Sequence, residues 1–339
     1  MASPLVGIIA NPASGRDIRR LVAHGTVFDN NEKTAIVRRV LLGLEAAGIT
    51  RVAYMPEHDF GIVSRALSGQ RLTLSAEPLS MPVLGTSADS MRAARLLAEQ
   101  GAGCIISLGG DGTNRAIAKG CGAVPLVPIS TGTNNVFPYF VEGTTAGLAA
   151  GFVATGCVTG QAMQRRPWLE VSVDGEPTDS ALIDVVVSSV PFVGARALWD
   201  LSTIQEVVLS QVIHGTIGLS ALGGALLGHA AAASAPSGMH IVLGSGGTRA
   251  LAALAPGLVT WVGVATHRIL SAGDVVCCRA KSGEGNPVGP FTIALDGERE
   301  LELSAAARVA VRLRADGPFV VDVPSALGMA ARAGYLQRS

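Results

Sequence analysis

The chain has 339 residues, of which 48% are hydrophobic and only 15% are charged, and this composition is typical of a globular protein and excludes a disordered one. The formal net charge is zero, so the broad charged surface of a protein that binds nucleic acid or acidic membranes is absent. The length is ample for a sizeable core and predicts two domains.

Short apolar runs alternate with helical patterns in the first half of the chain. Helices are expected over 32–47 and 87–100, with Ser87 or Asp89 as the N-cap of the second, and another helix is expected to begin near Asn114. The apolar runs predict buried strands at 5–10, 51–55, 81–84, 104–108 and 124–129. Strands that alternate with helices predict a mostly parallel sheet covered by helices.

From about Trp168 the pattern changes to alternating apolar and polar residues, which predicts half-buried antiparallel strands joined by turns. These strands are expected at 169–173, 291–295, 300–303 and 309–313. Residues 217–233 are almost entirely apolar but fall short of the roughly 20 residues of a membrane span, so we expect a buried helix rich in glycine and alanine. The pattern therefore predicts an α/β domain over residues 1–160 and a β-rich domain over 161–339, the last residues of which can pack back on the first domain.

The cysteines and the N-terminus bear on the compartment. The first residues have no basic region and no long apolar run, so no signal peptide is expected. No CxxC pair occurs, and we expect buried free thiols in a reducing cytoplasm. The five cysteines are Cys104, Cys121, Cys157, Cys277 and Cys278. We thus expect a cytoplasmic homo-oligomer, a dimer or tetramer, that acts on a small molecule and neither spans a membrane nor binds nucleic acid.

A glycine-rich turn follows the strand expected at 104–108. It reads Gly109-Gly110-Asp111-Gly112-Thr113. Ligands of parallel sheets bind beyond the carboxyl ends of the strands, and glycines let the backbone bring its N–H groups close to a phosphate. Asp111 has no basic neighbour in the turn, and it is well placed to take a proton or to help hold a metal. The alternative is a tight strand-to-helix turn with Asp111 as the N-cap.

Two further polar loops follow strands at the same edge of the expected sheet. After the first strand come Asn11-Pro12-Ala13-Ser14-Gly15, in which Ser14 and the backbone can bind phosphate, although a plain turn fits equally well. After the strand at 124–129 come Ser130-Thr131-Gly132-Thr133-Asn134-Asn135. Three such loops on neighbouring strand ends predict one polar crevice, and their coincidence is stronger evidence for a phosphate site than any single loop is.

A further polar segment occurs in the second half of the chain. Asp296-Gly297-Glu298 directly follows the strand expected at 291–295. An Asp-Gly pair is common in the turn of a β-hairpin, and that interpretation is favoured for these residues taken alone.

These segments together resemble the superfamily of NAD kinases, diacylglycerol kinases and sphingosine kinases. Residues 5–15 and 55–58 look most like the ATP-NAD kinase/AcoX group, which includes a protein of acetoin-catabolism operons. The order and approximate spacing fit over nearly the whole chain. The resembling segments are Asn11 to Gly15, Gly109 to Thr113, Thr131 to Asn134, and Asp296 to Glu298. The resemblance implies a three-layer α/β domain of the Rossmann-like kind and a C-terminal β-sandwich.

The resemblance also implies the chemistry, which is transfer of a phosphate from ATP to a hydroxyl with Mg²⁺ or another divalent cation. Asp111 would activate the acceptor, and the three loops would hold phosphates; the metal ligands stay unassigned. Such a reaction depends mainly on positioning and on neutralising charge. For the acceptor we expect NAD, in NADP biosynthesis, or a related small metabolite. A candidate acidic site in the second domain comprises Asp184, Asp296 and Glu298.

The chain departs from the NAD-kinase pattern in the second domain. NAD kinases carry an Asn-Glu pair in a sequence like ALNEVV, whereas residues 181–186 have Ile183 and Asp184 at those positions. An apolar side chain cannot supply amide hydrogen bonds, so the family resemblance is a poor guide to whether NAD is the substrate of this chain. Two alternatives stay open: a lipid kinase, favoured by Asp296-Gly297-Glu298, and a non-catalytic nucleotide-binding protein, favoured by the altered pair.

Overall fold

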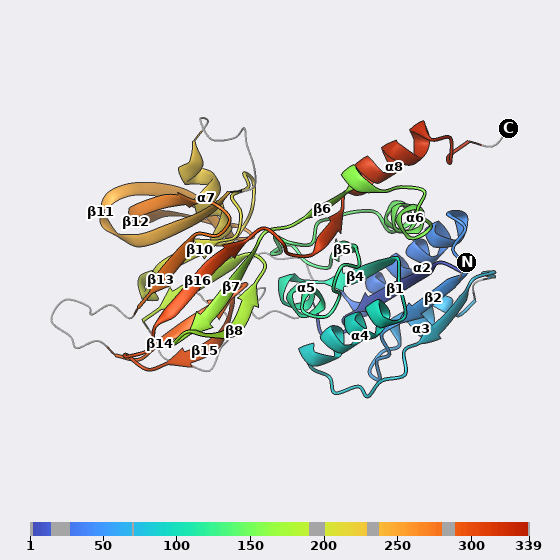
Figure 1. The fold of residues 1–339 in the computed structure, drawn as a ribbon, viewed down its shortest axis with the longest axis horizontal. Coiled ribbons are helices and arrows are strands. Elements are labelled where there is room, and N and C mark those ends of the chain that lie inside the picture. Colours follow the sequence, from blue (N-terminus) through green and yellow to red (C-terminus); the bar gives the residue numbers. More distant parts are fainter. Residues whose placement is uncertain are drawn as a thin grey trace. The chain divides into compact units, whose positions relative to one another are not determined.

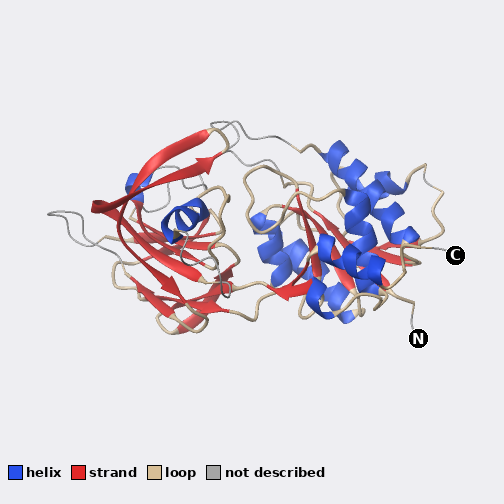
Figure 2. Ribbon diagram, turned by 90° about the horizontal axis from the view of Figure 1, so that it is seen from above, coloured by secondary structure: helices blue, strands red, loops and turns tan. Residues whose placement is uncertain are grey.

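The computed structural model describes residues 3–14, 28–69, 71–189, 201–228, 237–279 and 289–337. These residues form two compact units (Figure 1). Unit 1 runs from the N-terminal part of the chain to Arg166 and resumes at Pro318, and unit 2 comprises Pro167–Gly317. The helices lie mainly in unit 1, and strands make up most of unit 2 (Figure 2).

Unit 1 is built on a seven-stranded sheet in the order β3-β2-β1-β4-β5-β17-β6. The strands are β1 (Leu5–Ala10), β2 (Arg51–Tyr54), β3 (Ser75–Pro78), β4 (Cys104–Gly109), β5 (Leu126–Ser130), β6 (Met163–Arg165) and β17 (Phe319–Val321). Only β6 runs antiparallel to its neighbour. Every residue of the three central strands β1, β4 and β5 is buried, as expected for a parallel sheet covered on both faces. The carboxyl ends of these strands therefore lie next to each other at one edge.

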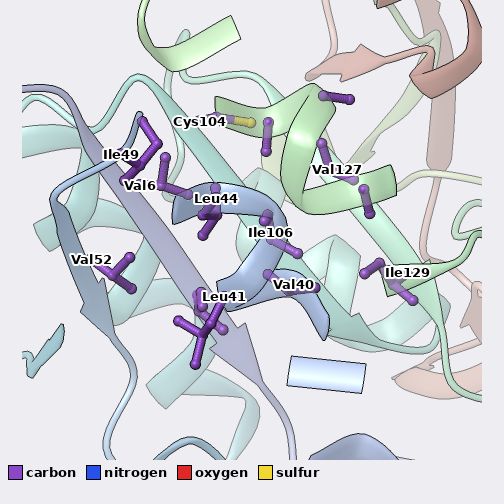
Figure 3. Close-up of a cluster of buried hydrophobic side chains, with 14 of the residues drawn as sticks. Val6, Val40, Leu41, Leu44, Ile49, Val52, Cys104, Ile106, Val127 and Ile129 are labelled. Atoms are coloured by element: carbon purple, nitrogen blue, oxygen red, sulfur yellow. The ribbon is translucent and has the colours of Figure 1, made fainter. Parts of the chain in front are cut away.

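Helices cover both faces of this sheet. They are α2 (Asn30–Ala46), α3 (Ile62–Leu67), α4 (Ser87–Glu99), α5 (Asp111–Ala118), α6 (Gly143–Ala154) and α8 (Val323–Arg332). Side chains of α2, α3, α6 and α8 pack on the face that carries Val6 and Ile8, whereas α4 and α5 pack on the face of Leu5 and Ile9. Figure 3 shows the first of these cores, in which α2 packs on the central strands. Unit 1 is therefore a three-layer α/β domain.

The crossing of α2 and α6 depends on glycine. A Cβ atom at Gly43 would lie 2.2 Å from the backbone oxygen of Thr144, and one at Gly147 would lie 2.3 Å from the backbone oxygen of Val40. No side chain fits at either position, so the two helix backbones are in direct contact. This contact fixes α2, the N-terminal end of which lies near the loop after β1.

Unit 2 contains two antiparallel sheets. The six-stranded sheet has the order β12-β11-β10-β9-β14-β15, and the four-stranded sheet has the order β13-β16-β7-β8. The strands are β7 (Trp168–Val173), β8 (Glu176–Ala181), β9 (Asp184–Ser188), β10 (Ile204–Leu209), β11 (Gly238–Ala255), β12 (Leu258–Leu270), β13 (Val275–Cys278), β14 (Phe291–Leu295), β15 (Glu298–Leu303) and β16 (Val309–Arg314). Apolar side chains of both sheets share one core, so unit 2 is a β-sandwich.

Three secondary-structure predictions need correction. The strand predicted at 81–84 is a loop, and the third strand of the sheet is β3, which lies at the edge, is mostly exposed and so lacks an apolar run. The helix expected near Asn114 begins at Asp111, and its N-cap is Gly110, not Asp111. The helix at 87–100 is capped by Thr86, with Asp89 completing a capping box.

The apolar stretch at 217–233 forms a shorter helix than predicted. Helix α7 spans Ser220–Leu227, and it packs on the outer face of the six-stranded sheet, although several of its side chains are partly exposed. Residues 229–233 lie outside the described residues. No helix in the described parts of the chain is long and apolar enough to cross a membrane. The cysteines are free thiols, of which Cys277 is exposed, contrary to the expectation that all would be buried.

Candidate functional site

Strands β1, β4 and β5 are neighbours in the parallel part of the unit 1 sheet (Figure 1), so the loops that follow them lie at the same carboxyl edge. The amide nitrogen Nδ2 of Asn11 donates to Oγ1 of Thr113 at 2.9 Å, which joins the first loop to the turn after β4. The hydroxyl oxygens of Ser14 and Thr131 lie 3.1 Å apart, which joins the first loop to the third. The structure thus brings together residues that are 102 and 117 positions apart in the sequence.

Two glycines of the turn after β4 lie in close contact with side chains of the site. A Cβ atom at Gly109 would lie 2.6 Å from the side chain of Thr113, and one at Gly110 would lie 2.9 Å from Oδ1 of Asn135. Gly112 lies in the first turn of α5. The turn leads directly into the N-terminus of α5, which is the end of a helix that favours an anion.

The carboxylate of Asp111 bridges two of the loops. Oδ1 accepts hydrogen bonds from the backbone N–H of Phe137 at 2.8 Å and of Val136 at 3.1 Å, and Oδ2 lies 3.1 Å from the same Val136 nitrogen. Asp111 is only partly buried. Its side chain therefore fixes the position of the loop after β5. It lies where the turn after β4 meets that loop, the place at which the sequence predicts the catalytic carboxylate.

The loop after β5 is held by its own side chains. Ser130, which is buried, donates from Oγ to the backbone oxygen of Gly132 at 2.7 Å, and Nδ2 of Asn135 donates to Oγ of Ser130 at 2.9 Å. Thr131 is buried, and Thr133 is partly buried in the same loop. Oδ1 of Asn134 is buried and has no hydrogen-bond partner within the described residues, so it is an acceptor that a ligand or a water can satisfy.

Two further residues of the site were not predicted from the sequence. Asn114 is fully buried, accepts from the hydroxyl of Ser107 at 2.7 Å and donates to the backbone oxygen of Gly110 at 2.9 Å, which supports the glycine turn from below. Lys33 of α2 is also fully buried, and its Nζ donates to backbone oxygens of the loop after β1. A lysine in an apolar helical pattern carries no sequence signal for such a role. Gly15, the last predicted residue of that loop, lies outside the described residues.

The predicted acidic residues of the second domain lie in unit 2. Asp296 forms the turn of the β14–β15 hairpin with Gly297, and its φ angle of 51° lies in the left-handed region that Asp tolerates. Its buried carboxylate accepts from the backbone N–H of Leu182 at 3.1 Å, of Ile183 at 2.7 Å and of Asp184 at 3.3 Å. Asp296 and Asp184 are thus in contact, and these bonds give the Asp296-Gly297 pair a structural role. Glu298 is partly exposed and begins β15.

Ile183, which the sequence predicts to lie at the position of the NAD-kinase asparagine, is buried, with 4% of its surface exposed. Its backbone is used by its neighbours, because its N–H donates to Asp296 and its carbonyl accepts from Ser210. The side chain has no polar group to offer a ligand. The structure therefore gives this position a packing role.

The residues of the site fit a cation that arrives with a nucleotide. Among the described residues, no group of three or more His, Cys, Asp or Glu side chains is arranged to hold a metal ion. Mg²⁺ is usually bound through one or two carboxylates and the phosphates of its substrate, not by an all-protein cage. The carboxylate of Asp111, together with the unsatisfied amide oxygen of Asn134 in the loop that Asp111 holds, agrees with that mode.

Two family models and the structure of one kinase agree with this architecture. Residues 6–157 match the ATP-NAD kinase N-terminal domain family, and residues 167–316 match the acetoin catabolism protein X C-terminal domain family. The fold resembles that of yeast NADH kinase solved with NADH, with a TM-score of 0.52 and 12% identity over 99% of this chain and 88% of that chain. A diacylglycerol kinase from Bacillus anthracis str. Sterne gives a TM-score of 0.46 with 11% identity over 95% and 97% of the two chains.

The sequence comparison identifies a much nearer relative. The chain is 38% identical to acetoin catabolism protein X of Cupriavidus necator over 352 aligned positions, which cover 99% of this chain and 95% of that protein. The resemblance to the ATP-NAD kinase/AcoX group is therefore confirmed, as is the fold that it implied. The chain belongs to the acetoin catabolism protein X family.

Proposed function

We propose that this chain is a phosphotransferase that moves a phosphate from ATP to a hydroxyl group of a small metabolite. The observation that carries the proposal is the convergence of the loops after β1, β4 and β5, which contact one another through Asn11–Thr113 and Ser14–Thr131. Hydroxyl groups, glycine backbone and a helix N-terminus gathered at one sheet edge are the elements of a phosphate site. The ATP-NAD kinase domain over residues 6–157 supports the same chemistry.

Each loop has a proposed role in the reaction. Glycines 109, 110 and 112 let backbone N–H groups approach the phosphates, and Ser14, Thr131 and Thr133 supply hydroxyl donors. Asp111 orients and deprotonates the acceptor hydroxyl or helps to hold the cation that accompanies ATP. Mg²⁺, when bound, neutralises the charge of the phosphates. Phosphoryl transfer requires little more than such positioning and neutralisation.

The acceptor is proposed to differ from that of an ordinary NAD kinase. Ile183 is buried and apolar at the position where NAD kinases carry an asparagine that binds NAD. The carboxylate of Asp296 accepts hydrogen bonds from the backbone N–H groups around it. A lost hydrogen bond that strands its partner costs about 1–3 kcal/mol, so NAD should bind weakly. The relative is named for acetoin catabolism, and acetoin is itself a small hydroxyl-bearing molecule. Acetoin therefore belongs beside NAD and NADH in an acceptor screen.

A specific observation favours a second candidate, a nucleotide-binding protein without turnover. The Asp111 carboxylate is engaged by the backbone N–H groups of Val136 and Phe137. Hydrogen bonds of this kind stabilise the charged form of a carboxylate and oppose its use as a base. In a protein that binds a nucleotide without turnover, the hydrogen bonds from Val136 and Phe137 to Asp111 would serve to hold the binding loop.

The test is a binding measurement followed by a turnover measurement. ATP with Mg²⁺ is titrated into the protein by calorimetry, and ADP release is then followed with NAD, NADH, acetoin and a short-chain diacylglycerol as acceptors. Binding with acceptor-dependent ADP release supports the kinase, and binding without release for any acceptor supports the second candidate. Absence of ATP binding would overturn both.

A further inference from the structure

Resting on the proposed function, we propose that Lys33 is a positioning residue that holds the loop after β1 in its phosphate-binding form. Its side chain is fully buried, with 0% of its surface exposed. Nζ donates to the backbone oxygens of Asn11 at 3.0 Å, Pro12 at 3.4 Å and Ser14 at 2.6 Å. Oδ1 of Asn30 lies 3.1 Å from Nζ as well, so the three ammonium hydrogens are shared among four oxygens.

A lysine is unfavourable at this position for two independent reasons. Burying an ammonium group costs free energy unless polar partners replace its water. Lys33 also lies in the first turn of α2, which begins at Asn30, and the positive end of a helix dipole disfavours a cation there. Three backbone oxygens of one short loop replace the lost water. The arrangement therefore links the stability of the lysine to one conformation of that loop.

The residues that Lys33 holds are the ones that reach the other loops. Asn11 gives its carbonyl to Lys33 and its Nδ2 to Thr113, and Ser14 gives its carbonyl to Lys33 while its hydroxyl lies beside Thr131. Carbonyl dipoles that point at one spot repel each other unless a cation lies between them. Without the ammonium only the loop's own hydrogen bonds, such as that from the Ser14 hydroxyl to the Asn11 carbonyl, would hold this conformation, and the contacts of Asn11 and Ser14 with the other loops would weaken.

The inference is tested with Lys33→Met, which keeps the length of the side chain without its charge, and Lys33→Arg, which keeps the charge. Lys119→Met is the matched control, because Lys119 is an exposed lysine of the same unit, at the C-terminal end of α5. Affinities for Mg·ATP and for AMP are measured by calorimetry, and thermal unfolding of each variant is recorded. Asn30→Ala, which removes one acceptor of Lys33 near the helix start, serves if Lys33→Met does not fold.

We expect Lys33→Met to weaken Mg·ATP binding at least about 10-fold while AMP, which lacks the outer phosphates, loses about 3-fold or less. Lys33→Arg should recover at least half of the loss on a logarithmic scale, Asn30→Ala should weaken Mg·ATP binding about 2- to 5-fold, and Lys119→Met should match the wild type. The inference would be overturned if Lys33→Met bound Mg·ATP as tightly as the wild type does, and the proposed function would still stand. If Lys33→Met does not fold, the same conclusion would follow from unchanged Mg·ATP binding by Asn30→Ala. A wild type that binds no Mg·ATP would overturn the proposed function and this inference with it.

Discussion

Replacing Asp111 by Asn separates the two roles that its carboxylate can have. The substitution keeps Oδ1, which can still accept from the N–H groups of Phe137 and Val136, but it removes the charge and places an NH₂ group in place of Oδ2 near the Val136 nitrogen. Hydrogen bonds to a charged acceptor become weaker neutral ones, which costs about 1 kcal/mol of stability. Loss of a general base lowers turnover by about 10²–10⁴-fold. We therefore expect a modest drop in the free energy of unfolding and a turnover reduced at least about 10²-fold.

The assay is ADP release at saturating Mg·ATP with the acceptor identified by the screen, together with urea unfolding. Asp89→Asn is the matched control, because Asp89 also lies in the first turn of a helix and accepts from backbone N–H groups, those of Leu84, Gly85 and Thr86. That variant should lose stability and keep its turnover. Wild-type turnover in Asp111→Asn would refute a catalytic role, and an equal loss in both variants would show that stability, not chemistry, limits the rate.

Three further predictions concern stability, and each is measured by urea unfolding. Asp296→Ala leaves three backbone N–H groups without an acceptor and should lower the free energy of unfolding by about 2–5 kcal/mol. The control is Asp174→Ala, at an exposed Asp-Gly turn with one such bond, which should lower it by about 1 kcal/mol. Equal losses would contradict the structural role of Asp296. Gly147→Ala forces a methyl group against a backbone oxygen of α2 and should cost about 1–3 kcal/mol or more; an unchanged midpoint would show that the helices can separate freely. Hydrogen bonds from Arg314 lower the pKa of Asp316 from 3.8 to about 2, so the stabilisation is present above about pH 4 and is lost as pH falls toward 2. Because the pair is exposed, Asp316→Asn should cost under about 1 kcal/mol at pH 7, with the difference shrinking at pH 3, and a difference that grows on acidification would refute the assignment.

The parallel half of the fold could be predicted because its signals are local. Buried strands such as 5–10 and 104–108 are continuous apolar runs, and the glycine-rich turn at 109–113 follows one of them directly. Parallel strands place their carboxyl ends together, so the proximity of Ser14 to Thr131 follows from topology without any knowledge of side-chain packing. The sequence alone therefore predicts that the motif segments lie at one edge of the sheet.

Other features could not be predicted because their cause is tertiary. Strand β3 is exposed at an edge, so pairing with β2, not burial, makes it a strand. The role of Lys33 depends on carbonyl groups about 20 residues away, and a helical pattern records only that a lysine is present. The long hairpin of β11 and β12 carries exposed apolar residues such as Trp261, and this irregular pattern hid both strands.

The return of the chain to unit 1 has a consequence for how the protein is made. Strand β17 joins the sheet between β5 and β6, although unit 2 separates it from them in sequence. The chain enters unit 2 along β6 and β7 and leaves along β16 and β17, with Trp168 paired to Arg314 and Arg165 paired to Phe319. Unit 2 is thus an insertion with adjoining ends. During synthesis unit 1 therefore lacks β17 and α8 until the whole of unit 2 has left the ribosome, and a deletion that joins 166 to 318 would complete the unit 1 sheet without unit 2.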